Sequence, residues 1–452
     1  MQTAPHQETP PGFFYPFATL QQLAADALTH ARQKGATAAE VDVSEGFGQS
    51  VTVRHGAVET IEHNRDKGLS VSVYVGQRRG HASTSDFSAK ALAETVEAAL
   101  NIARFTAEDE CAGLPEADLL ARETKDLALC HPWELSVDAA VELAQRAETA
   151  AFAEDARIKN SEGASVSTQQ GQFVSANSLG FMGGYPTSRH AIVCSVIAGE
   201  GDAMQRDDWY ATHRDAARLE TPESVGQKAA QRAAARLGAR KIGTGRFPVI
   251  FEAPQAAGLL GHFVQAVSGG ALYRKSSFLL DSLGQTLFPD FFQLQERPHL
   301  PSALASSPFD NDGVRTEDRD VVKNGVLEGY FLSVYSGRKL GLPTTGNAGG
   351  SHNLILQPGE NDLAGLLRVM GRGLLVTELL GYGVNAVTGD YSRGAAGFWV
   401  EDGTIVHPVE EITIAGNLKE MFKSIRAIGR DVHIRGSKQT GSLLLDGMMI
   451  AG

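Results

Sequence analysis

The chain has 452 residues, of which 42% are hydrophobic and 21% charged, a composition typical of globular proteins with a sizeable core. Its formal net charge is -12 and no run of Lys or Arg exceeds two residues, which argues against a nucleic-acid partner. No apolar run approaches 18 residues, so we expect no membrane partner either.

The cysteines and the N-terminus indicate where the protein works. Cys111, Cys130 and Cys194 have no spacing typical of a disulfide framework or of a metal knuckle. The first 17 residues lack a basic stretch followed by an apolar one, as a signal peptide would have. We therefore expect a cytoplasmic protein.

The N-terminal region begins with a predicted flexible arm, residues 1–16, which are rich in Pro and polar side chains. A helix should follow, because apolar residues recur there at helical spacing, and Gly35 would end it. These apolar residues are Leu20, Leu23, Ala24, Ala27, Leu28 and Ala31.

Alternating apolar residues then predict antiparallel strands over 41–43, 51–53 and 69–75, with a turn at His55-Gly56. A second helix should follow Ser85-Asp86, with Leu92, Val96, Leu100 and Ala103 on its apolar face. Residues 106–135 are less regular and are predicted to be a linker.

A similar order of elements follows the linker. Ser136 is predicted to cap a helix that runs to about Asp155, and strands are expected over 164–168, 173–175 and 191–197. Thr221 and Pro222 open another helix. Because helix, strands and helix occur twice, the predicted N-terminal α+β domain, residues 17–242, is a candidate for an internal duplication.

Residues 243–452 differ in character, with frequent Gly and few helix signals. A strand over 247–251 and a helix over 256–268 are expected, and short strands should fill 310–450, apart from one helix near 363–379. The predicted fold class is α+β: a mixed helix and strand domain followed by a mostly antiparallel β domain.

Two short motifs are better explained as turns. Residues 436–442 have the two glycines of a phosphate loop, but no Lys follows the second glycine, and a strand comes next instead of a helix. Residues 310–313 resemble the start of a calcium loop, but Val321 stands at the twelfth position, where a bidentate Glu is needed. The chain also has no G-x-S-x-G and no H-E-x-x-H motif.

Four segments in order, residues 269–279, 307–316, 388–401 and 411–419, resemble the PmbA/TldE family. This resemblance implies a two-subunit zinc peptidase that cleaves loosely structured peptides. One subunit, TldD-like, holds zinc through an H-E-x-x-x-H helix and a distant Cys. The other subunit generally lacks these ligands.

The chain departs from the zinc-binding pattern at nearly every position. The resemblance places the first His at His262, but Phe263 stands at the Glu and Val267 at the second His. The segment that would carry the Cys, 436–441, contains none. Catalytic zinc normally takes three protein ligands and a water, so we expect no zinc and no catalytic residue in this chain. His262, a remnant ligand position at most, is by itself more often a hydrogen-bonded helix residue.

We expect zinc only in a TldD-like partner subunit, with this chain completing a chamber for an extended peptide. Candidate contacts with the peptide or the partner are Arg274, Ser276, Ser277, Tyr391 and Arg393, although a solvated loop or a turn would explain them too. A homodimer is possible in isolation. Two alternatives stay open: a homodimeric hydrolase of another mechanism, and a noncatalytic protein-binding regulator, for instance of DNA gyrase.

Overall fold

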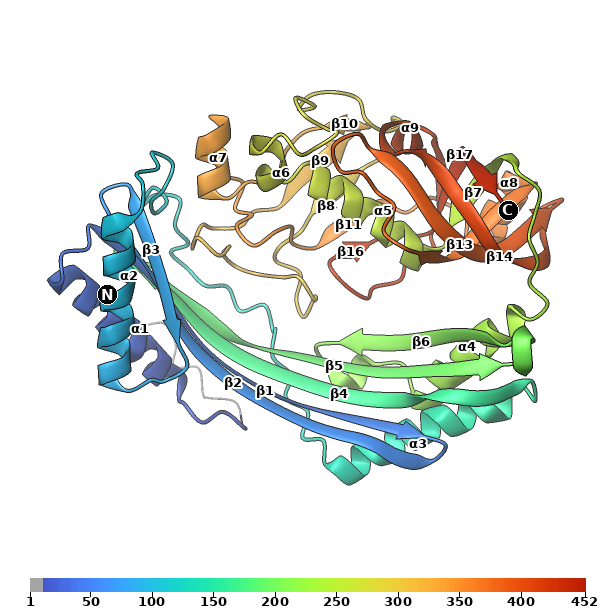
Figure 1. The fold of residues 1–452 in the computed structure, drawn as a ribbon, viewed down its shortest axis with the longest axis horizontal. Helices are drawn as coiled ribbons and strands as arrows, with labels where there is room; N and C mark the ends of the chain where they lie inside the picture. Colours follow the sequence, from blue (N-terminus) through green and yellow to red (C-terminus); the bar gives the residue numbers. More distant parts are fainter. Residues whose placement is uncertain (1–10) are drawn as a thin grey trace.

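The computed structural model describes residues 11–452, so the predicted arm over 1–16 lies mostly outside the described residues. The N-terminal half is built on one six-stranded sheet with the order β3-β2-β1-β4-β5-β6, in which every neighbouring pair is antiparallel (Figure 1). Its strands are β1 (Ala38–Arg54), β2 (Ala57–Val75), β3 (Arg78–Thr84), β4 (Ile158–Asn177), β5 (Met182–Ala198) and β6 (Gln205–His213).

The strands of this sheet are longer than predicted. Segments 41–43 and 51–53 belong to the single strand β1 of 17 residues, and 164–168 and 173–175 to the single strand β4 of 20 residues. The predicted turn at His55-Gly56 is confirmed, because both residues have positive φ, 50° and 72°, between β1 and β2.

Four helices accompany the sheet: α1 (Phe17–Gln33), α2 (Ala89–Phe105), α3 (Val137–Glu154) and α4 (Pro222–Ala235). The predicted caps are confirmed: Ser136 accepts a hydrogen bond from the Ala139 N–H, and Thr221 accepts one from the Ser224 N–H. Helix α3 lies on the face of the sheet that is turned away from the C-terminal half (Figure 1).

The order helix, strands, helix does occur twice, as α1-β1-β2-β3-α2 and α3-β4-β5-β6-α4. The two sets meet at the central β1–β4 pair. From this pair outward, the strands follow in chain order on both sides: β1, β2 and β3 on one side, and β4, β5 and β6 on the other. That the two sets arose by duplication remains a prediction.

Residues 106–136 contain no helix and no strand, and they run along the C-terminal half. The Ala121 N–H donates to the Gly313 carbonyl over 3.0 Å, and the Arg315 N–H donates to the Leu119 carbonyl over 3.0 Å. The predicted linker is therefore tied by backbone hydrogen bonds to the loop around residue 313.

The C-terminal half contains two sheets. One has the order β14-β13-β12-β7-β17-β15, with a further β14–β17 pairing that joins five of its strands into a ring, and the other has the order β10-β9-β8-β11-β16. Only the β7–β12 and β11–β16 pairs are parallel. The strands are β7 (Gly245–Phe251), β8 (Leu294–Glu296), β9 (Arg319–Lys323), β10 (Val326–Leu327), β11 (Leu354–Leu356), β12 (Gly373–Leu380), β13 (Asp390–Glu401), β14 (Thr404–Asn417), β15 (Ile425–Ile428), β16 (Lys438–Gln439) and β17 (Leu443–Ala451).

The helices of this half are α5 (Ala253–Ala266), α6 (Gly269–Tyr273), α7 (Val334–Leu340), α8 (Leu363–Met370) and α9 (Leu418–Lys423). The predicted α+β class is confirmed, but the helix expected near 363–379 is confirmed only over Leu363–Met370. Helix α8 stops at Gly371, whose φ is 72°, and the following apolar run forms the buried strand β12. None of the helices in residues 11–452 is long and apolar enough to cross a membrane.

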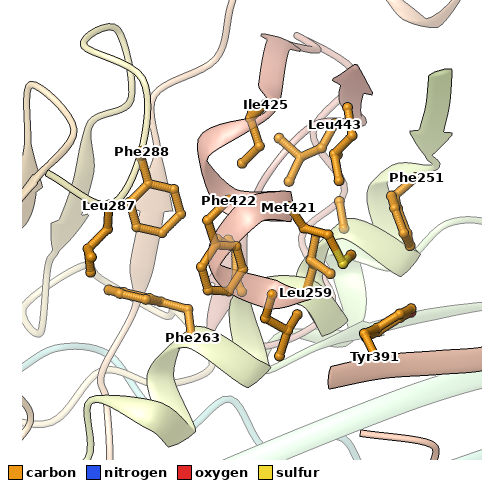
Figure 2. Close-up of a cluster of buried hydrophobic side chains, with 14 of the residues drawn as sticks. Phe251, Leu259, Phe263, Leu287, Phe288, Tyr391, Met421, Phe422, Ile425 and Leu443 are labelled. Carbon is orange, nitrogen blue, oxygen red and sulfur yellow. The ribbon is translucent and has the colours of Figure 1, made fainter. Parts of the chain in front are cut away.

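The largest hydrophobic cluster surrounds α5 in the C-terminal half (Figure 2). It joins one face of α5 to residues from the loop over 278–292, from α9 and from the strands beside it. Its largest fully buried side chains are Phe251, Phe263, Phe288, Phe292, Tyr391 and Phe422. This core fixes the face that α5 turns toward the N-terminal sheet.

Candidate functional site

Helix α5 is the element on which the family's metal site would be built. It begins with Pro254 in its first turn, where a missing N–H costs nothing. Its core-facing side consists of Ala256, Leu259, Leu260, Phe263 and Ala266. The remaining faces of the helix are available for chemistry.

His262 lies beside this apolar face, half-buried, with its ring edge-on to Tyr391 of β13 and the two ring centroids 6.0 Å apart. Burial lowers the pKa of His262, and the positive charge of Arg393 lowers it further. The imidazole is therefore neutral at pH 7.

Two further predicted site residues, Tyr391 and Arg393, lie near His262. Tyr391 is fully buried, which raises its pKa to about 12, and its hydroxyl has no hydrogen-bond partner within residues 11–452. Arg393 donates from Nη2 to the Leu379 carbonyl over 3.3 Å, whereas its buried Nε has no acceptor in the same part of the chain. Three of the predicted residues thus form one polar cluster at the edge of the core.

Phe263 and Val267, where the resemblance places the family's Glu and second His, are both completely buried. The ring of Phe263 packs edge-on against both Phe288 and Phe422, inside the hydrophobic cluster (Figure 2). Both side chains point into the core, away from any position where a ligand or a general base could serve a metal.

The segment 436–441, where the resemblance would place the family's Cys, lies beside α5. The Cε of Lys438 is 3.7 Å from the place where a Cβ would sit on Gly261. This segment offers Lys438 in place of a thiolate, and nowhere in residues 11–452 do three His, Cys, Asp or Glu side chains form a group able to hold a metal ion. The donor set around α5 therefore does not fit a catalytic zinc site.

The motif at 436–442 is an extended segment with the short strand β16, and it leads into the strand β17. No helix N-terminus follows it, so the turn interpretation fits better than a phosphate loop. The segment at 310–313 is likewise a turn, in which Asp310 accepts from the Asp312, Val314 and Ala348 N–H groups, each over 2.9 Å.

Arg274, Ser276 and Ser277 lie apart from His262, after α6. Arg274 is exposed and donates to the hydroxyl of Tyr273 over 2.9 Å. Ser276 donates to the Ala271 carbonyl over 3.3 Å, and the buried Ser277 donates to the Ala266 carbonyl over 2.6 Å. A role for these three residues in binding a peptide or a partner stays a prediction.

A pocket that sequence reasoning missed lies where the N-terminal sheet meets α5, and we call it the junction pocket. Its volume is ≈ 260 Å³. It is lined by Tyr210, Ala253, Pro254, Ala257, His433, Arg435, Gly436, Ser437 and Lys438. Segment 433–438 approaches β6 here (Figure 1), and the Cζ of Arg435 is 4.1 Å from the ring centroid of Tyr210.

A second cavity of ≈ 270 Å³ shares Tyr210, Pro254 and Arg435 with the junction pocket and extends along residues 206–210 of β6. The two cavities form a continuous polar lining between β6 and α5. In the sequence its residues stand in two distant segments: Arg435 directly before Gly436 and Lys438 between Gly436 and Gly441, and the aromatic pair Trp209-Tyr210 after two acids.

Comparison with known proteins defines the class to which this arrangement belongs. Residues 39–103, 130–237 and 244–452 match domain 1, the central domain and the C-terminal domain of the PmbA/TldA metallopeptidases. The chain belongs to this metallopeptidase family.

Particular relatives span nearly the whole chain. Metalloprotease PmbA of Escherichia coli O157:H7 is 50% identical over 433 residues, and the Metalloprotease PmbA homolog of Haemophilus influenzae is 49% identical over 434 residues. Each match covers 96% of both proteins. The Metalloprotease TldD homolog of Haemophilus influenzae is only 22% identical, over 84% of this chain and 83% of that relative.

Solved structures share the fold. A crystal structure from Bacteroides thetaiotaomicron, named as a candidate modulator of DNA gyrase, has a TM-score of 0.90 at 30% identity and covers 96% of this chain and 98% of its own. The crystal structure of TldE from Thermococcus kodakarensis has a TM-score of 0.83 at 20% identity and covers 95% of this chain and all of its own, so it bears on the fold alone.

Proposed function

We propose that this chain is the subunit of a two-subunit zinc peptidase that does not hold the zinc. The observation that carries the proposal is the burial of Phe263 and Val267, at the two positions beside His262 where a zinc subunit needs a Glu and a His. A hydrolytic zinc needs an open coordination site and a general base beside its bound water. Packed core side chains supply neither, so the metal comes from a TldD-like partner subunit.

The role of this chain is then to complete the chamber and to hold an extended peptide. Strand β6 is one of the two edge strands of the six-stranded sheet, and no other backbone group of residues 11–452 pairs with its outer side. An unpaired strand edge is a template for an added strand. The peptide lies along β6 beside the cavity that follows residues 206–210.

The first test compares the purified chain alone, a zinc-bearing TldD-like relative alone, and their mixture. Zinc content is measured by mass spectrometry of the metal, and peptidase activity with an unstructured peptide of about a dozen residues. The proposal expects this chain to be free of zinc and inactive, with full activity only in the mixture.

Stoichiometric zinc and peptide cleavage in this chain alone would overturn the proposal, and His262→Ala would then be the first variant to test for metal loss. Because His262 is half-buried at the edge of the core, Gln265→Ala on the exposed side of α5 is a matched control for helix stability.

A second candidate function is a noncatalytic regulator of DNA gyrase, because a fold relative 30% identical to this chain is named as a candidate modulator of that enzyme. With a net charge of -12, such a role would act through protein contact and not through DNA. Capture of gyrase subunits by the purified chain, with no effect of a TldD-like relative, would favour this function over the peptidase subunit.

A further inference from the structure

The junction pocket collects cationic side chains and contains no carboxylate. The cations Arg435 and Lys438 line it, together with the ring of His433, whose pKa is lowered by burial, and the hydroxyls of Tyr210 and Ser437. Within residues 11–452, neither the Arg435 side chain nor the Lys438 side chain forms an ion pair or a hydrogen bond. In a chain of net charge -12, two unneutralised cations in one pocket are a strong departure from the average surface.

Arg435 is held in place by two aromatic rings. Its Cζ lies 3.7 Å from the ring centroid of Trp209 and 4.1 Å from that of Tyr210, so the guanidinium is stacked and its N–H groups have fixed directions. Its Nη2 is buried and has no acceptor among the described residues. Glu220 and Asp208 act on its charge from a distance, and neither forms an ion pair with it.

Lys438 is half-buried against α5, beside Gly261. Burial lowers the pKa of its ammonium group, and no nearby charge opposes that change. Burying a cation without a neighbouring anion costs desolvation free energy, and an acidic ligand bound in the pocket would offset that cost. Both cations are therefore preorganised for an anion that the chain itself does not supply.

We propose that the junction pocket binds a carboxylate of the peptide, either its C-terminal carboxylate or an Asp or Glu side chain. The inference rests on the proposed function, which supplies the peptide and lays it along β6 toward Arg435. A stacked guanidinium presents a planar fork that matches a carboxylate.

The test measures binding of the full chain to a fluorescent octapeptide without Asp or Glu, made with a free C-terminal carboxylate and as the C-terminal amide. A third peptide carries the amide and one internal Glu, which separates the two sources of carboxylate. We expect at least one carboxylate peptide to bind about tenfold more tightly than the neutral amide.

Lys438→Gln and Arg435→Gln should each remove most of this preference, and Lys438→Arg should retain it. Lys159→Gln is the matched control, because Lys159 is an exposed lysine of β4 with no ion pair to another described residue. Its preference should equal that of the unchanged chain. Thermal unfolding of each variant checks that the pocket is folded.

Equal binding of all three peptides would overturn the carboxylate site and leave peptide binding, and with it the proposed function, intact. If no peptide binds, the proposed function fails. Calorimetric titration with citrate then tests separately whether the junction pocket binds a carboxylate. Citrate binding that Lys438→Gln abolishes and Lys159→Gln retains would uphold the site. No citrate binding would overturn it.

Discussion

The ring of Phe263 packs edge-on against the ring of Phe288, with their centroids 5.2 Å apart and their planes at 80°. This pair ties α5 to the loop over 278–292 and places a core side chain directly after His262. The two possible uses of the position, as a general base in the cleft or as a core contact, exclude each other, because one side chain cannot point both ways.

Phe263→Glu should destabilise the fold without creating a metal site. Losing a buried aromatic ring costs about 3–5 kcal/mol, and burying a carboxylate adds to that loss. Urea unfolding should therefore give a free energy of unfolding lower by at least about 3 kcal/mol, with no zinc retained after dialysis.

Phe105→Glu is the control for this change, because Phe105 is 91% exposed at the end of α2. Its free energy of unfolding should change by less than about 0.5 kcal/mol. A Phe263→Glu chain that kept its stability and bound one zinc would show that α5 can turn this position toward the cleft.

Arg214 should be a structural residue of large effect. It is buried and donates to four backbone carbonyls: those of Leu129, Ser188, Ala303 and Leu304. Arg214→Met would remove all four hydrogen bonds, although the Leu129 and Ala303 carbonyls keep the Ser188 and Ser306 N–H groups as donors. A buried acceptor that loses its partner costs about 1–3 kcal/mol. We expect a loss of about 3 kcal/mol or more in urea unfolding.

The control is Arg218→Met, four residues further along the chain, because the Arg218 side chain is exposed. Its effect should stay within about 0.5 kcal/mol. If the two variants were equally stable, the carbonyls around Arg214 would have to be satisfied by water.

The element types were predictable where local signals were strong. Ser136 and Thr221 cap their helices as expected, since a side-chain oxygen before an apolar stripe is a local feature. The length of β4 was not predictable, because Gln170 and Gln172 interrupt its apolar alternation. In the fold both are buried, and Gln172 donates to the Tyr15 carbonyl over 2.7 Å, a contact 157 residues apart in sequence.

The candidate site was predictable only in part, for a similar reason. His262, Phe263 and Val267 led us to expect no zinc site in this chain, because the residue types of metal ligands can be compared position by position, and that expectation stays a prediction. The junction pocket was not predicted, since Arg435 and Tyr210 are brought together only when the segment 433–438 meets β6. Short sequence motifs carry no information about such a meeting of distant segments.

Asp310 should make stability depend on pH. Burial, with the nearby negative charge of Asp312, raises the pKa of Asp310 from 3.8 to about 7. The folded state then binds a proton that the unfolded state has released, so this group's contribution to stability is largest below about pH 4 and falls as the pH rises to about 7. The difference between the two pKa values limits the effect to about 4 kcal/mol.

Asp310→Asn removes this titration, so the stability difference between the two proteins should change between about pH 4 and pH 7 and be constant above pH 8. Urea unfolding at several pH values measures it. Asp26→Asn, on an exposed stretch of α1, controls for the general effect of one carboxylate. A difference that does not vary with pH would mean that the three N–H donors around Asp310 keep it ionised.

Arg232 of α4 should hold the N-terminal sheet to α5. Its Nε lies 3.1 Å from a carboxylate oxygen of Asp207 on β6, and its Nη1 lies 2.9 Å from one of Glu252 before α5. All three side chains are at most 16% exposed. Arg232→Met would leave Glu252 without an ion pair among the described residues, whereas Asp207 keeps Arg236 at 3.6 Å. Removing one partner of a buried ion pair typically costs about 3–5 kcal/mol.

The same substitution at the exposed pair of Arg146 and Glu223 separates burial from charge. Those side chains are 45% and 43% exposed, so Arg146→Met should cost no more than about 1 kcal/mol. Hydrogen exchange should show where the stability is lost. Arg232→Met should speed exchange in β6 and at the start of α5, and Arg146→Met should leave exchange in both places unchanged. If both variants lost the same stability, the buried ion pairs of Arg232 would not be what holds β6 against α5. The core contacts of α5 alone would then determine the shape of the junction pocket.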